Sequence, residues 1–190
     1  MTDERWRLFV AVPIGEELRE ALRESLEEWR NDDALAGLRW ADPTGWHVTL
    51  AFLGLTEAAE TPALADRMAA VAEAHQQMTF RTGGLGAFPT PARARVAWYG
   101  VEDDAGRMAM LAADLSTALG LDASRRLRPH LTLARVRRQP VDLRPWLASA
   151  SAPDAVLATD RIELMRSHTV RGPARYETLA SISLGVTAGV

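Results

Sequence analysis

The chain has 190 residues, 47% of them hydrophobic and 25% charged, which suits one globular domain over residues 1–190. It has no cysteine, which excludes disulfides, thiolate catalysis and cysteine-ligated zinc. The net charge of −3 argues against a general duplex-binding protein, which would normally be basic. The N-terminal apolar run at 8–14 is too short for a signal peptide or a membrane span, so we expect a cytoplasmic protein with no membrane association.

Hydrophobic periodicity predicts strands and helices along the whole chain. The first helix is the clearest, because its apolar residues recur at helical spacing: Leu18, Leu22, Leu26 and Trp29. In chain order the predicted elements are a strand at 7–12, a helix at 15–32, a short strand and turn at 38–46, a strand at 47–54, a helix at 56–78, two extended pieces at 79–102, a helix at 104–121, a strand at 129–136, helical turns at 142–150, and strands at 160–170 and 174–185 joined by a Gly-Pro turn at 172–173.

The order of these elements repeats. Each half of the chain holds a strand, a helix and then a strand that begins His-x-Thr-Leu, and the two histidines, His47 and His130, are 83 residues apart. No low-complexity linker separates the halves. We therefore predict an α+β fold of two lobes related by a pseudo-two-fold axis. Each lobe is expected to be an antiparallel sheet with helices on its outer face, and the cleft between the lobes is expected to hold the active site.

The motifs at 47–50 and 130–133 each place two polar side chains on one face of a strand. Side chains alternate between faces, so His47 lies beside Thr49, and His130 lies beside Thr132. Two lobes related by a two-fold axis would bring both imidazoles and both hydroxyls around one small volume. The apolar residues of the first motif strand are expected on the opposite face, in a core: Val48, Leu50 and Phe52.

Two imidazoles and two hydroxyls suit the hydrolysis of a phosphodiester. One neutral imidazole can accept a proton from water while the other, protonated, donates one to a leaving oxygen, and each transfer is worth roughly 10²–10⁴ in rate. The hydroxyls can donate to phosphate oxygens as charge builds up. This chemistry requires no metal and no other cofactor. The alternatives are hydrogen-bonded core histidines, or a metallohydrolase, for which neither motif supplies a carboxylate.

Arginine supplies all 22 basic residues of the chain. Six arginines flank the second motif, with no acidic residue between positions 125 and 138: Arg125, Arg126, Arg128, Arg135, Arg137 and Arg138. Guanidinium groups suit phosphate oxygens, but a solvated charged face is also a common arrangement, and both interpretations stay open. The remaining histidines, His75 and His168, belong to no repeated motif and are predicted to lie at the surface, although His168 could still line the cleft.

Segments around the two motifs extend the pattern over nearly the whole chain: RLFVAV, LRWADPTGWHVTLAFLG, GLGAFPTPARARVAWYGV, PHLTLARV and ARYETLASISL. In order and spacing they resemble the two-histidine (2H) phosphoesterase superfamily, and within it the RNA 2′,3′-cyclic phosphodiesterases of the LigT type, formerly described as 2′-5′ RNA ligases. The resemblance implies a LigT-like fold. It also implies metal-independent hydrolysis of a terminal 2′,3′-cyclic phosphate on RNA or a nucleotide, leaving a 2′-phosphomonoester.

The resemblance also implies a role for each motif residue. His47 would be the proton donor to the leaving O3′, and His130 would be the proton acceptor that activates water. Thr49 and Thr132 would hold the phosphate oxygens. The implied partners are RNA ends or nucleotides bearing a 2′,3′-cyclic phosphate. Nothing in the sequence indicates an obligate protein partner, so we expect a monomer.

Two further residues are predicted to bind substrate. The resemblance makes Arg135 a phosphate contact, but it lies an odd number of residues after His130, and strict alternation would place it on the wrong face. Either a β-bulge reverses the alternation, or Arg135 reaches around the strand edge, or it is a surface charge. Tyr176, in the segment ARYE, could reach the cleft or be an ordinary strand tyrosine.

Two other functions remain open at this stage. A related activity of the same superfamily, 2′-5′ oligonucleotide phosphodiesterase or RNA ligase activity, would use the same residues on a different substrate. A non-catalytic RNA-end binding module could use the same cleft without turnover. Defined substrates and the position of phosphate in the product would separate these functions.

Overall fold

The computed structural model describes residues 4–124, 126–168 and 174–185. Its strands are β1 (Arg5–Pro13), β2 (Leu38–Trp40), β3 (His47–Glu57), β4 (Met78–Phe88), β5 (Val96–Val101), β6 (His130–Val136), β7 (Ala155–Thr159), β8 (Arg161–His168) and β9 (Arg175–Ser183). Its α-helices are α1 (Glu16–Arg30), α2 (Thr61–Glu73), α3 (Arg107–Ala118) and α4 (Arg144–Ser149). Its 3-10 helices are η1 (Asp33–Leu35), η2 (Pro43–Gly45), η3 (Ala58–Glu60) and η4 (Pro91–Arg93).

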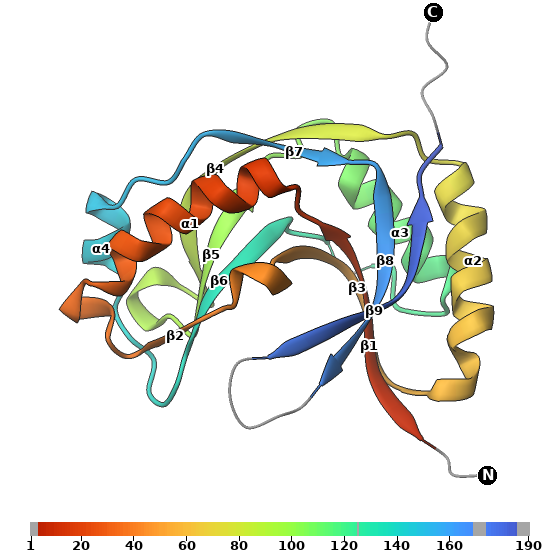
Figure 1. The fold of residues 1–190 in the computed structure, drawn as a ribbon, viewed down its shortest axis with the longest axis horizontal. Helices are drawn as coiled ribbons and strands as arrows, with labels where there is room; N and C mark the ends of the chain where they lie inside the picture. Colours follow the sequence, from red (N-terminus) through yellow and green to blue (C-terminus); the bar gives the residue numbers. More distant parts are fainter. Residues whose placement is uncertain (1–3, 125, 169–173, 186–190) are drawn as a thin grey trace, which may run out of the picture.

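The strands form a curled antiparallel sheet in the order β7-β4-β5-β6-β3-β1-β8-β9, with β2 paired to β6. The predicted α+β class and the antiparallel pairing are therefore confirmed. The two motif strands, β3 and β6, are adjacent at the centre of this order, and one residue pair joins them, Val48 with Leu131. Figure 1 shows the two halves of the sheet diverging from this joint.

Helices α1 and α3 each pack on the half of the sheet that does not contain the strand next to them in the chain. Helix α1 follows β1 in the chain but packs against β7, and α3 precedes β6 in the chain but packs against β3 and α2. In Figure 1, α1 and α4 lie on the half that contains β4 to β7, and α2 and α3 lie on the other. One continuous apolar core includes residues from both halves. The two-lobe organisation of residues 1–190 stays our interpretation of this arrangement.

Most predicted elements are present, but several boundaries differ. The predicted helix at 56–78 is shorter, because pairing extends β3 to Glu57 opposite Arg5 and starts β4 at Met78. Strand β7 was not predicted, since its residues show no clear periodicity, and it forms by pairing with the edge of β4. The predicted Gly-Pro turn at 172–173 lies outside the described residues. No helix in the described part of the chain is long and apolar enough to span a bilayer.

Candidate active site

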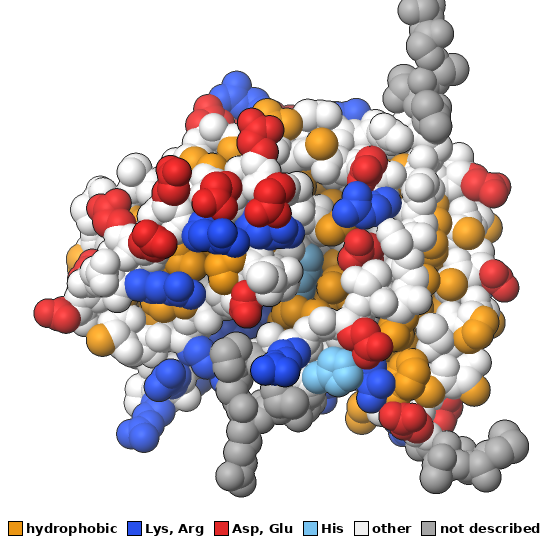
Figure 2. Space-filling model, viewed as in Figure 1, with side chains coloured by type: hydrophobic (Ala, Val, Ile, Leu, Met, Phe, Trp, Pro, Cys, Tyr) orange, Lys and Arg blue, Asp and Glu red, His pale blue; other side chains and the backbone are white. Residues whose placement is uncertain are grey.

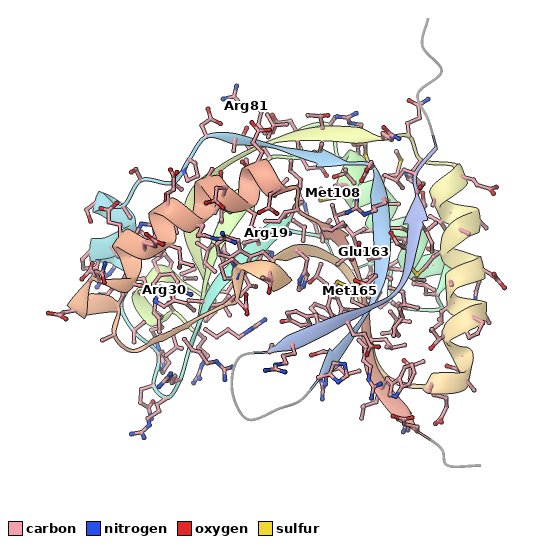
Figure 3. The ribbon with its side chains drawn as sticks, viewed as in Figure 1. Arg19, Arg30, Arg81, Met108, Glu163 and Met165 are labelled. Atoms are coloured by element: carbon pink, nitrogen blue, oxygen red, sulfur yellow. The ribbon has the colours of Figure 1, made fainter. Side chains whose placement is uncertain are left out.

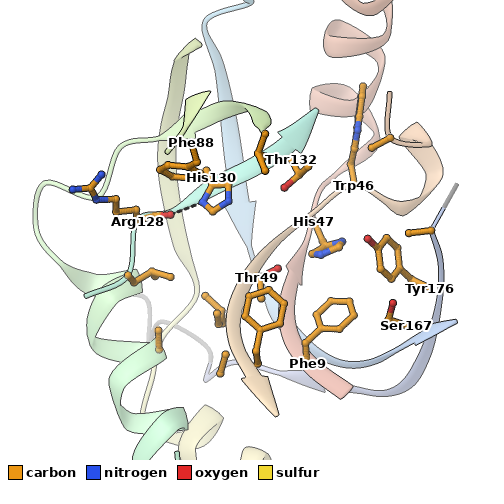
Figure 4. A pocket seen from close by; sticks show the side chains of 18 of the residues that line it. Phe9, Trp46, His47, Thr49, Phe88, Arg128, His130, Thr132, Ser167 and Tyr176 are labelled. Atoms are coloured by element: carbon orange, nitrogen blue, oxygen red, sulfur yellow. Dashed lines mark hydrogen bonds between the residues drawn. The ribbon is translucent and has the colours of Figure 1, made fainter. Parts of the chain in front are cut away.

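The two motifs meet where β3 pairs with β6. Val48 and Leu131 form this pair, and each lies between the histidine and the threonine of its own motif. Because the strands are antiparallel, the histidine of each motif lies beside the threonine of the other. Figure 4 shows the two imidazoles on opposite sides of the cleft with the two hydroxyls between them. The six residues predicted from the sequence all line this cleft, which has a volume of about 1020 Å³: His47, Thr49, His130, Thr132, Arg135 and Tyr176.

Both imidazoles are held by the same kind of hydrogen bond. Nδ1 of His47 lies 2.7 Å from the carbonyl oxygen of Gly45, and Nδ1 of His130 lies 2.6 Å from the carbonyl oxygen of Arg128. A carbonyl oxygen can only accept, so each Nδ1 carries the proton. Nε2 of each ring is therefore the nitrogen available for proton transfer in the cleft. The two carbonyls fix the tautomer that acid and base catalysis need.

The turn before β3 positions His47. In η2 the Asp42 carboxylate accepts hydrogen bonds from the backbone N–H and the hydroxyl of Thr44, which stabilises the turn that presents the Gly45 carbonyl. Arg19 of α1 fastens this turn to the fold, because its Nε donates to the Pro43 carbonyl at 3.1 Å (Figure 3). The turn is thus tied both to itself and to the first helix.

Aromatic rings enclose each imidazole. The His47 ring centroid lies 4.9 Å from those of both Phe9 and Tyr176. A Cβ at Gly45 would approach the Tyr176 ring to 3.0 Å, so glycine allows this close packing. On the other side of the cleft, the His130 ring lies 5.0 Å from Phe88 in an edge-to-face arrangement. These contacts restrict the orientation of both rings.

Each motif strand contains a β-bulge directly after its threonine. The ladder of β3 with β1 skips Leu50, and the ladder of β6 with β5 skips Leu133. An inserted residue reverses the alternation of the side chains that follow. Phe52 and Arg135, three residues after the two threonines, are therefore exposed and line the cleft.

The bulges explain the positions of Arg135, which the sequence left open, and of Phe52, which was predicted wrongly. The bulge in β6 turns Arg135 to the face of His130 and Thr132, which removes the conflict in its spacing. The prediction that Phe52 anchors a core was wrong, because its side chain is 64% exposed at the cleft. The signal that could have placed Phe52 was the matching text of the motifs, TLAF and TLAR, which aligns it with Arg135.

The electrostatic surroundings of the two imidazoles differ. Burial lowers the pKa of His47 and of His130, and the positive charge of Arg135 lowers the pKa of each further. The Glu163 carboxylate opposes this effect at His47 and raises its pKa. Glu163 lies on β8 opposite Ala11 and accepts a hydrogen bond from the Thr178 hydroxyl at 3.0 Å. The pKa is therefore lowered at both rings, but a carboxylate partly offsets the lowering at His47, and no acidic side chain of the described residues does so at His130.

Comparison with known proteins identifies the family and several relatives of this chain. The LigT like Phosphoesterase family matches residues 12–98. The RNA 2′,3′-cyclic phosphodiesterase of Thermus thermophilus is 32% identical, in an alignment that covers 94% of this chain and 90% of the relative. That of Archaeoglobus fulgidus is 31% identical over 135 residues, covering 70% of this chain and 74% of the relative. The chain belongs to the LigT-like phosphoesterase family.

A further relative and a solved structure support the assignment of this chain to the LigT-like phosphoesterase family. The RNA 2′,3′-cyclic phosphodiesterase of Geobacillus stearothermophilus is 31% identical over 95% of this chain, which spans 58% of the length of that relative. Among solved structures, E. coli LigT complexed with 3′-AMP has a TM-score of 0.75 and 26% identity, covering 95% of this chain and 99% of LigT. The LigT-like fold predicted from the sequence is confirmed.

The arginines of this LigT-like phosphoesterase gather around the cleft unevenly. Three arginines line the cavity from β6 and the segment before it: Arg126, Arg128 and Arg135. Two more line it from other strands, Arg7 from β1 and Arg39 from β2. Figure 2 shows basic side chains along the lower edge of the molecule, over the loop that follows β6 and beside the ends of β8 and β9, and acidic side chains over α1. Arg125, one of the six arginines noted in the sequence, lies outside the described residues.

The two remaining histidines lie outside the cleft. The prediction that His75 is a surface residue was wrong: it is 8% exposed, and its Nε2 lies 2.9 Å from the Asp114 carboxylate, which joins the end of α2 to α3. His168 is partly exposed, pairs with Glu177 at 2.9 Å and lines a smaller cavity beside the cleft. Across residues 4–124, 126–168 and 174–185, no three histidine or acidic side chains come together in a way that could hold a metal ion.

Proposed function

We propose that this chain hydrolyses terminal 2′,3′-cyclic phosphates on RNA or nucleotides and leaves a 2′-phosphomonoester, by paired-histidine acid and base catalysis without a metal. Its family membership and its relatives named RNA 2′,3′-cyclic phosphodiesterase support the reaction class. The observation that carries the mechanism is the ring of four side chains around one cleft, with imidazoles on opposite sides and hydroxyls between. A monomeric state and a cytoplasmic location remain predictions from the sequence.

The reaction follows from the tautomers of the two rings. Nε2 of His130 accepts a proton from a water molecule as the water oxygen forms its bond to phosphorus. The bond from phosphorus to O3′ breaks, and Nε2–H of protonated His47 donates its proton to O3′. The phosphate stays on O2′. His130 ends protonated and His47 neutral, and exchange of one proton with solvent restores both.

The roles of acid and base are supported by the difference in charge around the rings. The carboxylate of Glu163 favours a proton on His47, the proposed acid. The negative charge of a bound cyclic phosphate adds to this effect, because an anion nearby favours the charged form of an imidazole. Within the described residues, no acidic side chain opposes the lowering of the pKa of His130, the proposed base.

The two threonine hydroxyls and three neighbouring side chains are proposed to contact the substrate. Thr49 and Thr132 lie between the imidazoles, where they can donate to the non-bridging oxygens as charge increases in the transition state. Arg135 adds a positive charge at the same face. The exposed ring of Phe52, and the Tyr176 ring packed on His47, offer aromatic surfaces to a nucleoside.

The test is to incubate the protein with an oligonucleotide that ends in a 2′,3′-cyclic phosphate, in the presence of EDTA, and to identify the product by phosphorus NMR. We expect a 2′-phosphomonoester, formed without added metal. A 3′-phosphomonoester would show that the other ribose oxygen leaves and would overturn the assignment of His47 and His130.

A matched control separates catalysis from folding. His75→Gln keeps a polar group within reach of Asp114 and lies outside the cleft, so it should retain activity. Binding of the cyclic end without turnover by the wild-type protein would instead support a non-catalytic RNA-end binding module.

A further inference from the structure

A second cavity lies directly beside the active-site cleft. It has a volume of about 290 Å³, and four of its wall residues carry basic side chains: Arg5, Arg7, Arg166 and His168. Arg7 and Ser167 line both cavities, and they face each other at the end of the β1–β8 ladder. The two cavities therefore adjoin at the point where β1 and β8 separate.

Among the residues that the structure describes, Arg7 is the cation at this junction that has no partner. The other basic groups have partners: Arg5 pairs with Glu57 at 3.2 Å, Arg166 pairs with Glu4 at 3.2 Å and its guanidinium lies 4.1 Å from the Trp6 ring centroid, and His168 pairs with Glu177. Arg7 is exposed and has no hydrogen bond or ion pair with any residue that the structure describes. It is therefore free to bind an anion that reaches the junction.

The stereochemistry of ribose sets the direction in which an RNA strand leaves the cleft. If His47 protonates O3′, then C3′ faces the His47 side of the cleft. The C4′–C5′ branch, which carries the rest of the strand, is attached at C3′, whereas the base is attached on the C2′ side. The phosphate on the 5′ side of the terminal nucleotide should therefore lie beyond His47, on the half formed by β1 and β8.

Arg7 lies in that direction. Phe9 packs on His47 with ring centroids 4.9 Å apart, and Figure 4 shows Phe9 and Ser167 on the His47 side of the cleft. The β1–β8 ladder is regular from Arg7 to Phe9, so these two side chains share the cleft face. Two residues of strand span about 6.6 Å, a distance comparable with the step between neighbouring phosphates in an extended strand.

We propose that Arg7, at the entrance to the smaller cavity, binds the backbone phosphate on the 5′ side of the terminal nucleotide, so that the preferred substrate is an RNA oligonucleotide rather than a mononucleotide. The cavity behind it continues the path toward the next phosphate. This inference rests on the proposed function, because it takes His47 as the group that faces O3′. The occupant is an RNA strand, since guanidinium groups form charge-assisted contacts with phosphate oxygens.

The experiment compares kcat/KM for adenosine 2′,3′-cyclic phosphate with kcat/KM for a trinucleotide that ends in the same nucleoside cyclic phosphate. We expect the wild-type protein to favour the trinucleotide by at least about tenfold, the size of one charge-assisted contact. Arg7→Gln should reduce this ratio by about tenfold, and Arg7→Lys should restore most of it. The slope of log(kcat/KM) for the trinucleotide against log[salt] should become shallower by about 0.7 in Arg7→Gln.

Arg126→Gln is the matched control, because Arg126 is another exposed arginine that lines the cleft but belongs to the second half. It should leave the trinucleotide preference as in the wild type. Equal hydrolysis of both substrates by the wild-type protein, or an unchanged ratio in Arg7→Gln, would overturn the inference but not the proposed function. Loss of the ratio in Arg126→Gln alone would place the strand on the other side of the cleft. Hydrolysis of neither substrate would overturn the proposed function itself.

Discussion

Strands β3 and β6 carry the same motif and the same bulge, yet they present different side chains to the cleft. After the bulge, β3 turns the Phe52 ring inward, and β6 turns the Arg135 guanidinium inward. The surroundings differ as well, since Glu163 lies near His47 and none of the acidic groups in the described part of the chain acts on His130. The repeated backbone places equivalent groups around one point. In the proposed mechanism, the side chains outside the repeat distinguish the acid, His47, from the base, His130.

The largest expected effect tests this difference between the two histidines. His47→Ala and His130→Ala should each lower kcat/KM for a 2′,3′-cyclic nucleotide by roughly 10²–10⁴, because each removes one proton transfer. A 4-nitrophenyl phosphodiester has a leaving group that needs no protonation. His47→Ala should therefore recover most of its activity on that substrate, and His130→Ala should not. Recovery by His130→Ala instead would reverse the proposed roles.

The next largest effect is expected when either threonine hydroxyl is removed. Thr49→Ala and Thr132→Ala should each lower kcat by on the order of 10²–10³ with a smaller change in KM, since the contact strengthens as charge develops. The serine variants keep the hydroxyl and should lose much less. A full loss of activity in Thr49→Ser would indicate a packing role for the methyl group rather than hydrogen bonding.

A smaller effect separates the residues after the two bulges. Arg135→Ala should lower kcat/KM by roughly 10–100-fold through loss of a charge-assisted contact. Phe52→Ala should mainly raise KM for nucleotide substrates, by about tenfold, through loss of base stacking. Phe52→Leu keeps apolar area without the aromatic face and serves as its control. If Phe52→Leu behaved as the wild type, stacking would not be the role of this residue.

The smallest effect is a shift in pH dependence. The lowered pKa values of both imidazoles predict a bell-shaped profile of kcat/KM with its maximum below pH 6.5. The acid limb reports the base, His130, which must be neutral, and the alkaline limb reports the acid, His47, which must be protonated. Glu163→Gln removes the carboxylate that raises the pKa of His47, so the alkaline limb should move to lower pH. The acid limb should stay in place, and movement of that limb instead would assign Glu163 to the other histidine.

The sequence by itself determined the repeat and the four polar side chains that it brings to the cleft. His47, Thr49, His130 and Thr132 follow from the spacing of two short motifs, because alternation along a strand is a local property of the backbone. The amphipathic helix with Leu18, Leu22, Leu26 and Trp29 follows from periodicity in the same way, and these four residues are buried.

Only the tertiary structure decided what depends on pairing between distant segments. The bulges at Leu50 and Leu133 exist because neighbouring strands set the register, and they turned Phe52 out of its predicted core and Arg135 into the cleft. The exchange of α1 and α3 between the halves, the burial of His75 beside Asp114, and the position of Glu163 near His47 are also long-range contacts. Local periodicity carries no information about such contacts, because they depend on which strands and helices come together in the folded chain.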